Sequence, residues 1–170
     1  MRLSNPMEQA LNEQLYEELG SFYIYLAMAA DFSAKQWPGM AKWMELQAKE
    51  ELGHAMRFYR FILERGGQVR LKALPQPQES WETPLAAFSA ALAHEQHITG
   101  RIHALVELAR QHKDYPSEVF LQWFVTEQVE EEAQLEPIIH RLKLAGDHPP
   151  ALFILDRELA AREEEGEEEE

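Results

Sequence analysis

Cysteine is absent from this chain of 170 residues. Disulfide bridges and thiolate metal ligands are therefore excluded, and any metal site must use oxygen and nitrogen donors. The absence of cysteine also fits a reducing compartment, and we expect a cytoplasmic protein. The first residues, "MRLSNPMEQALNEQ", contain no apolar stretch of the kind that a secretory signal requires.

Long apolar runs and basic charge are also scarce. No window approaches 18 uncharged apolar residues, so we expect no membrane-spanning helix. The formal net charge is −14, of which the last eight residues, "EEEGEEEE", carry −7 and residues 1–162 carry the remaining −7. A body this acidic argues against nucleic acid as the main partner. It is compatible with cations, and solubility alone is the alternative explanation.

Glycine and proline separate four long segments that have helical periodicity. We expect helices over residues 5–34, 40–65, 84–112 and 117–145, and a short helix over 151–162. Pro137 lies inside the fourth segment, where we expect a kink. We expect residues 1–162 to form one domain and the acidic residues 163–170 to form a disordered tail.

Connection lengths predict how these helices are arranged. The links "KQWPG" and "HKDYPS" are short, so the helices that they join should be antiparallel neighbours. The link "QVRLKALPQPQESWETP" is long and rich in proline, which favours an extended crossover between parallel second and third helices. The sequence therefore predicts an all-α protein, a four-helix bundle with one long crossover and a short fifth helix.

Each of the four long segments carries a glutamate on its apolar face. Alternating steps of three and four trace the packing seam of each helix, and Glu18, Glu51, Glu95 and Glu131 interrupt these seams near their middles. A misdrawn seam or a side chain that reaches out to water explains one such residue. Four at matching depth require another explanation, because ionised carboxylates in a low-dielectric core repel one another and are costly to desolvate.

Two divalent cations would remove this cost, so the pattern predicts a di-metal centre. His54 follows Glu51 by three residues and shares its helix face. Carboxylates with one histidine and no sulfur suit iron or manganese better than copper or structural zinc. Di-iron bundles take Glu-x-x-His from two helices, whereas the fourth helix here has Gln128-x-x-Glu131. We therefore expect two unequal metal positions, only one of which has an imidazole ligand, with Glu51 as the bridge.

Several motifs along nearly the whole chain carry a family resemblance. They are "LNEQLYEELGSFYIYLAM", "AKEELGH", "HEQHITGRI", "DYPSEVFLQWFVTEQVEEE" and "HRLKLAGD". On these motifs the sequence resembles the bacterial non-haem ferritins. The resemblance implies a ferritin-like four-helix bundle and a ferroxidase that oxidises Fe(II) with dioxygen or hydrogen peroxide. It also implies iron storage as ferric oxyhydroxide inside a homo-oligomeric shell of about 24 subunits.

The same resemblance implies a role for individual residues. Glu18, Glu51 and His54 would hold the first iron. Glu51, Glu95 and Glu131 would hold the second, with Gln128 near it. Tyr25 lies two helical turns after Glu18 on the same seam and would stand beside the iron as an electron donor. Trp123 matches a tryptophan that lies near the iron site in this family. Aromatic packing is the alternative role for both Tyr25 and Trp123.

A third, cavity-side iron site is also implied by the family. Its ligands would be Glu50, Glu127 and Glu130, with Glu131 shared. Residues 127, 130 and 131 cluster on one side of a helix, as a metal site requires, and a solvated acidic face is the alternative.

Departures from related families narrow the assignment. Leu52 stands where a bacterioferritin has its haem-ligating methionine, so we expect no haem. The cysteine-rich module of rubrerythrins is absent. The starved-cell DNA-protecting cages lack a fifth helix and place their metal ligands between subunits. The fifth helix and the ligands on all four helices that we expect here favour a ferritin instead.

Several further histidines and tryptophans are candidates for a place at the surface or between subunits. His94 and His97 flank Glu95, and we expect both at the surface or at an interface. The candidates for contacts between subunits are Trp37, Trp43 and Trp81. Two alternative classes remain: a di-metal oxidase or peroxide-detoxifying enzyme without iron storage, and a metal-free bundle whose glutamates pair with arginine. The seams offer no basic residue at matching depth, which disfavours the second.

Overall fold

The computed structural model describes residues 2–163. These residues form five helices and no strand: α1 (Asn5–Ala34), α2 (Pro38–Glu64), α3 (Pro84–Gln111), α4 (Tyr115–Ala145) and α5 (Pro149–Leu159). The expected all-α fold is confirmed. Residues 164–170, which make up most of the expected disordered tail, lie outside the described part of the chain.

Three helices begin two residues before their expected starts. α2, α4 and α5 each carry a proline at their first or second position. Proline suits the first helical turn because the backbone N–H that it lacks has no partner there. The prolines that separate the predicted helical segments therefore lie in the first turn of the next helix. α4 also continues through Pro137.

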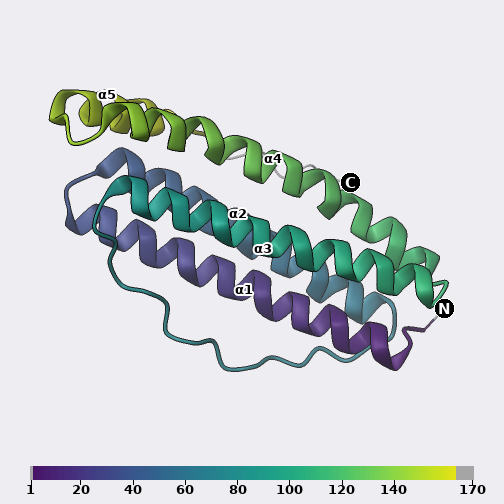
Figure 1. Ribbon diagram of the computed structural model, residues 1–170. Coiled ribbons are helices and arrows are strands. Elements are labelled where there is room, and N and C mark those ends of the chain that lie inside the picture. The colour runs from purple at the N-terminus through teal and green to yellow at the C-terminus, as the bar shows by residue number, and fades with distance from the viewer. Residues whose placement is uncertain (1, 164–170) are drawn as a thin grey trace.

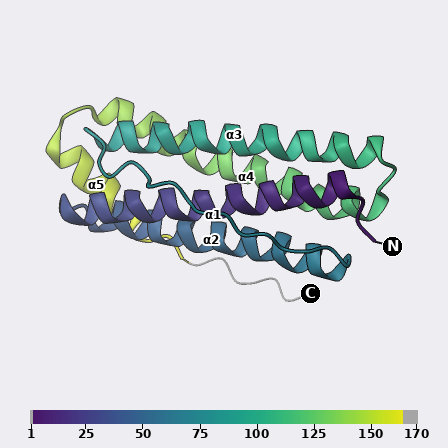
Figure 2. The same cartoon turned by 90° about the horizontal axis from the view of Figure 1, so that it is seen from below.

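The long helices form two antiparallel pairs, and the crossover lies outside them (Figure 1). α1 packs against α2, α3 packs against α4, and α5 contacts α2 and α4. The crossover is bound to α1 at two places. The backbone N–H of Arg70 donates to Asn12 (2.7 Å), and that of Trp81 donates to Asp31 (3.1 Å). It therefore runs in the direction of α1, as Figure 2 shows, which makes α2 and α3 parallel as predicted.

The apolar core is divided into two clusters. One contains Tyr25, Phe32, Met44 and Phe88, and the other contains Leu11, Phe58, Ile102 and Phe124. The glutamate on the seam of each long helix falls between the buried residues of that helix that line one cluster and those that line the other; these glutamates are Glu18, Glu51, Glu95 and Glu131. A polar layer therefore crosses the middle of the bundle, with apolar packing on both sides.

Two of the three tryptophans proposed for contacts between subunits are buried within the chain itself. Trp43 and Trp81 expose only 4% and 6% of their surfaces and belong to the apolar core, so that expectation was wrong for both. Trp37 is half-buried, with its ring centroid 5.4 Å from that of Phe153 on α5. No helix among the described residues is long and apolar enough to cross a membrane.

Candidate metal centre

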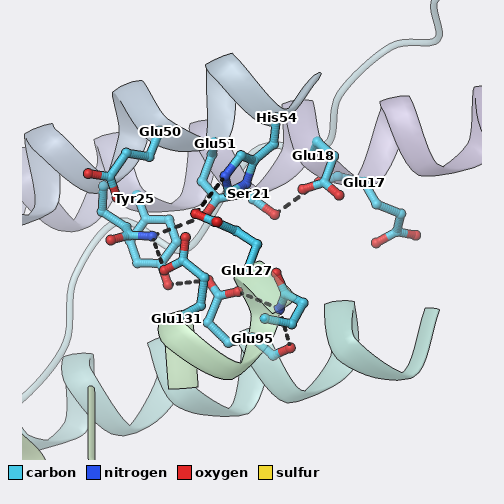
Figure 3. A network of polar contacts seen from close by, with 12 residues as sticks. Glu17, Glu18, Ser21, Tyr25, Glu50, Glu51, His54, Glu95, Glu127 and Glu131 are labelled. Carbon is cyan, nitrogen blue, oxygen red and sulfur yellow. Dashed lines mark hydrogen bonds and ion pairs between the residues drawn. The ribbon is translucent and has the colours of Figure 1, made fainter. Parts of the chain in front are cut away.

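The polar layer contains every carboxylate that was predicted from the seams. Each long helix contributes one, and Figure 3 shows them converging from the two helix pairs. The buried residues of the layer that were expected to form the site are Glu18, Glu51, His54, Glu95, Gln128 and Glu131. None is more than 5% exposed. The four seam glutamates lie at the same depth in the bundle, and they therefore meet in one cluster.

Three groups of residues in this layer present ligand atoms that lie within 4.8 Å of one another. They are Glu18, Glu51 and His54; Glu51, Glu95 and Glu131; and His54, Glu127 and Glu131. The first two groups match the two expected metal positions, and Glu51 is common to both. Of these two groups only the first includes an imidazole, so their residues differ in the way that the sequence predicts for two unequal metal positions.

His54 is held between two carboxylates. Its Nδ1 lies 3.3 Å from Oε2 of Glu51, and its Nε2 lies 3.6 Å from Oε1 of Glu127. The ring also meets Trp123 edge-on, with 5.5 Å between ring centroids. Trp123 therefore packs directly against a candidate ligand.

Burial controls the protonation of these carboxylates. Burial, and after it the charge of Glu51, raises the pKa of both Glu18 and Glu95 to about 8. The pKa of Glu131 is also raised well above its ordinary value, by burial and then by Glu51 and Glu95. Burial acts on Glu51 in the same sense, but the charge and hydrogen bond of His54 outweigh it and lower the pKa of Glu51. The layer therefore resists full ionisation unless a cation enters.

The oxygen atoms of Glu18 differ in their surroundings. Oε1 accepts a hydrogen bond of 2.8 Å from the side-chain amide of Gln14. Oε2 is buried, and no donor among the described residues reaches it. An acceptor buried without a donor is costly in a folded protein. A metal ion in the first ligand group would supply the missing partner.

Two glutamines that support the layer were missed in the sequence. Gln14 donates to Glu18, and the Nε2 of Gln47 donates to Glu51 Oε1 (3.1 Å) and to Glu131 Oε2 (2.6 Å). Gln14 and Gln47 each precede a seam glutamate by four residues, which places both members of each pair on one helix face. That spacing was the available signal.

Gln128 and Tyr25 both contact Glu95. The amide of Gln128 donates to Glu95 Oε2 at 3.2 Å, so in this conformation it supports a candidate ligand. The Tyr25 hydroxyl donates to Oε1 of the same carboxylate. Burial raises the pKa of Tyr25 well above its ordinary value, and the charge of Glu95 adds to the effect. Tyr25 is therefore a protonated donor beside the second ligand group.

The expected third site is only partly assembled. Glu127 and Glu131 share a group with His54, but Glu50 and Glu130 do not belong to it. Glu50 is paired with Arg162, with 2.6 Å between Oε2 and Nη2, and Glu130 is exposed. A third metal position with the expected four ligands stays a prediction.

The two histidines beside Glu95 have different environments. His97 is exposed, as expected, and pairs with Glu17 at 3.1 Å. His94 is half-buried, with its Nε2 2.7 Å from the Ser21 hydroxyl and its ring edge-on to Tyr25. His94 is thus neither fully exposed nor fully buried, and its expected place at the surface or at an interface stays a prediction. The Ser21 contact joins α1 to α3, which no sequence spacing reveals.

The metal-free alternative requires basic partners for the four buried carboxylates. Among residues 2–163, no lysine or arginine forms an ion pair with Glu18, Glu51, Glu95 or Glu131. The partners in their place are side-chain amides, Tyr25 and His54. This environment favours a cation over a permanent internal salt bridge.

A bundle of four long helices crossed by a buried layer of carboxylates is the architecture typical of four-helix proteins that hold two metal ions. Within that class, the model of the ferritin-like domain family matches residues 8–145. The bacterial non-heme ferritins of Bacteroides fragilis and Staphylococcus aureus are 37% and 39% identical to this chain over 160 residues. These matches cover 94% of this chain and 99% and 96% of the relatives. The chain belongs to the ferritin family.

Solved structures agree with this membership. An open-pore ferritin from the hyperthermophilic archaeon Archaeoglobus fulgidus has a TM-score of 0.93 and 46% sequence identity. The match covers 95% of this chain and 99% of that one. The shared fold therefore includes all five helices rather than the bundle alone.

Proposed function

We propose that this protein is an iron-storage subunit with ferroxidase activity. The observation that carries the proposal is the pair of buried ligand groups that share Glu51. Two Fe(II) ions are the substrates that such a pair would take, because hard carboxylate oxygens and one imidazole suit iron. The similarity to bacterial non-heme ferritins along 94% of the chain supports the same choice of metal.

The ligand set favours oxidation of bound iron. Glu18, Glu51 and His54 would bind one Fe(II), and Glu51, Glu95 and Glu131 the other. Carboxylates in a buried layer stabilise Fe(III) more than Fe(II), because the ion of higher charge gains more from them. Each Fe(II) loses one electron. Dioxygen accepts the two electrons with two protons and becomes hydrogen peroxide, or hydrogen peroxide accepts them with two protons and becomes two water molecules.

The remaining expectations stay part of the proposal. Fe(III) would move to the cavity of a shell of about 24 chains and form an oxyhydroxide mineral there. We also retain a cytoplasmic location, the absence of haem, and Tyr25 as an electron donor. Tyr25 is suited to that role because its hydroxyl bonds directly to Glu95.

Aerobic loading with Fe(II), followed by size-exclusion chromatography with iron measured in the protein peak, tests the proposal. The expected result is a large assembly that retains many iron atoms per chain. A small oligomer that consumes oxygen without retaining iron would support the alternative di-metal oxidase or peroxide-detoxifying enzyme instead.

Substitution of the shared ligand tests the site separately from storage. Glu51→Gln keeps the size of the side chain but removes its charge, so we expect initial Fe(II) oxidation to slow by about 100-fold or more, while the shell still assembles. The matched control is Glu45→Gln, an exposed position on α2, which should oxidise iron at the wild-type rate. Equal rates in all three proteins would refute the assignment of Glu51.

A further inference from the structure

Arg162 connects the end of the described chain to the polar layer. It follows α5, and its side chain is 12% exposed. Its Nη2 donates to Oε2 of Glu50 (2.6 Å), and its Nη1 donates to Oε1 of Gln47 (3.0 Å). The guanidinium carbon lies 4.4 Å from the ring centroid of Trp43. All three contacts are with α2, so they hold the Arg162 side chain in one position on the helix that carries Glu51.

The docking of α5 determines where Arg162 lies. The Asp156 carboxylate accepts a hydrogen bond of 2.8 Å from the backbone N–H of Met40, and Lys42 donates to the carbonyl of Ala160 at 2.8 Å. Leu155 is buried in the apolar core. These contacts fix the position of α5 on α2. The register of α5 therefore brings Arg162 to Gln47.

Gln47 lies between Arg162 and two candidate ligands. Its side chain is fully buried, and its Nε2 donates to Glu51 and Glu131, while its Oε1 accepts from Arg162. A half-turn of the amide would exchange these two ends. Arg162 has no acceptor atom, so it accommodates only the amide oxygen. It thereby keeps the NH₂ group directed at the two carboxylates.

We infer that Arg162 is a positioning residue for the metal centre, acting through the Gln47 amide. In this orientation Gln47 occupies Oε1 of Glu51 and Oε2 of Glu131, which leaves the other oxygen of each for a cation. Without Arg162 the amide can turn, and its oxygen then either repels the carboxylates or becomes an additional ligand. The inference rests on the proposed metal site. It adds a residue after α5 that controls how the ligands of this site are oriented.

Titration with Co²⁺ tests this inference without any oxidation step. The visible absorption of Co²⁺ reports the number and arrangement of its ligands as well as its binding. Wild-type protein should bind two Co²⁺ ions per chain. Arg162→Met keeps most of the packing volume but removes the hydrogen-bond donors. We expect this variant to bind one of the two Co²⁺ ions roughly 10- to 100-fold more weakly and to change the absorption spectrum of that ion.

Three further variants separate positioning from a general structural effect. Arg162→Lys should recover most of the affinity, because an ammonium is also a donor without an acceptor. Gln47→Met should lower the affinity for the same Co²⁺ ion. The Arg162→Met/Gln47→Met double variant should bind that ion no more weakly than Gln47→Met alone. Arg157→Met, at an exposed position of α5, should behave as wild type.

The outcomes distinguish this inference from the proposed function. A wild-type protein that binds no Co²⁺ would overturn the proposed site together with the inference. Two bound ions in the wild type and an unchanged affinity and spectrum in Arg162→Met would overturn the inference alone. Losses that add in the double variant would also overturn it, because Arg162 would then act independently of Gln47.

Discussion

The buried glutamates have opposite effects on folding and on metal binding. Glu18 is 1% exposed, and burial followed by the charge of Glu51 raises its pKa to about 8. At neutral pH the metal-free fold must therefore take up a proton there, or hold a charge that is poorly solvated. The free energy of unfolding of the metal-free protein is lower as a result. A bound cation reverses this balance.

The substitution Glu18→Gln should reveal this opposition. In metal-free protein at pH 7 it should raise the free energy of unfolding by about 1–3 kcal/mol, because Gln needs no proton on folding. It should also weaken Co²⁺ binding, since the first ligand group loses an anion. Chemical denaturation with a chelator present measures the first effect, and Glu45→Gln on exposed α2 surface serves as the control. A destabilised metal-free variant would contradict the argument.

At the scale of elements, α5 depends on one close backbone approach. A Cβ atom placed on Gly39 would lie 1.8 Å from the backbone oxygen of Asp156. Gly39 follows Pro38 in the first turn of α2, next to Met40, whose N–H bonds to the Asp156 carboxylate. The start of α2 and the body of α5 therefore fit together only with glycine at this position.

Replacing Gly39 by alanine should displace α5. We expect Gly39→Ala to lower the free energy of unfolding by about 2–4 kcal/mol, because backbone atoms must move to relieve the clash. The displacement would also carry Arg162 away from Gln47. Gly100→Ala is the control, since a Cβ at this exposed helical position meets nothing within 4 Å, and it should be neutral or stabilising. Thermal unfolding of both variants measures the difference, and equal midpoints would disprove the dependence.

Sequence patterns predicted the elements better than the contacts between distant elements. Glycine, proline and helical periodicity gave all five helices, and seam glutamates gave the carboxylate layer, because both signals are local. Gln47 was missed although it lies four residues before Glu51. Arg162 and His94 could not have been found in this way. Their partners lie 115 and 73 residues away in the sequence, and only the docking of whole helices brings them together.

For the whole molecule, the polar layer divides one core into two apolar clusters. Each cluster joins parts of all four long helices, so apolar packing on either side fixes the depth at which the carboxylates meet. Helices held in this way cannot slide apart to relieve repulsion within the layer. The bundle therefore stores an electrostatic cost at its centre, and its stability should depend on both pH and metal.

The pH dependence follows from the direction of the pKa shifts. Glu18 and Glu95 have a pKa of about 8 in the fold against an ordinary value of 4.5. The unfolded chain therefore releases these protons first, and the folded chain binds more protons between about pH 4.5 and 8. Stability must then fall as pH rises through this window. The raised pKa of His54 acts in the same direction, because its partner Glu51 stabilises the protonated form at lower pH.

We expect the unfolding midpoint of metal-free protein to fall by roughly 5–10 °C between pH 5 and pH 8. Saturating Co²⁺ should abolish or reverse this fall, because binding needs deprotonated ligands and strengthens as pH rises. Thermal unfolding at fixed protein concentration, with chelator and with Co²⁺ in parallel, measures both slopes. In Glu18→Gln/Glu95→Gln protein the metal-free slope should be much smaller. A midpoint that is constant or rises with pH in the metal-free wild type would show that the layer ionises without cost, and the electrostatic case for a cation at its centre would fail.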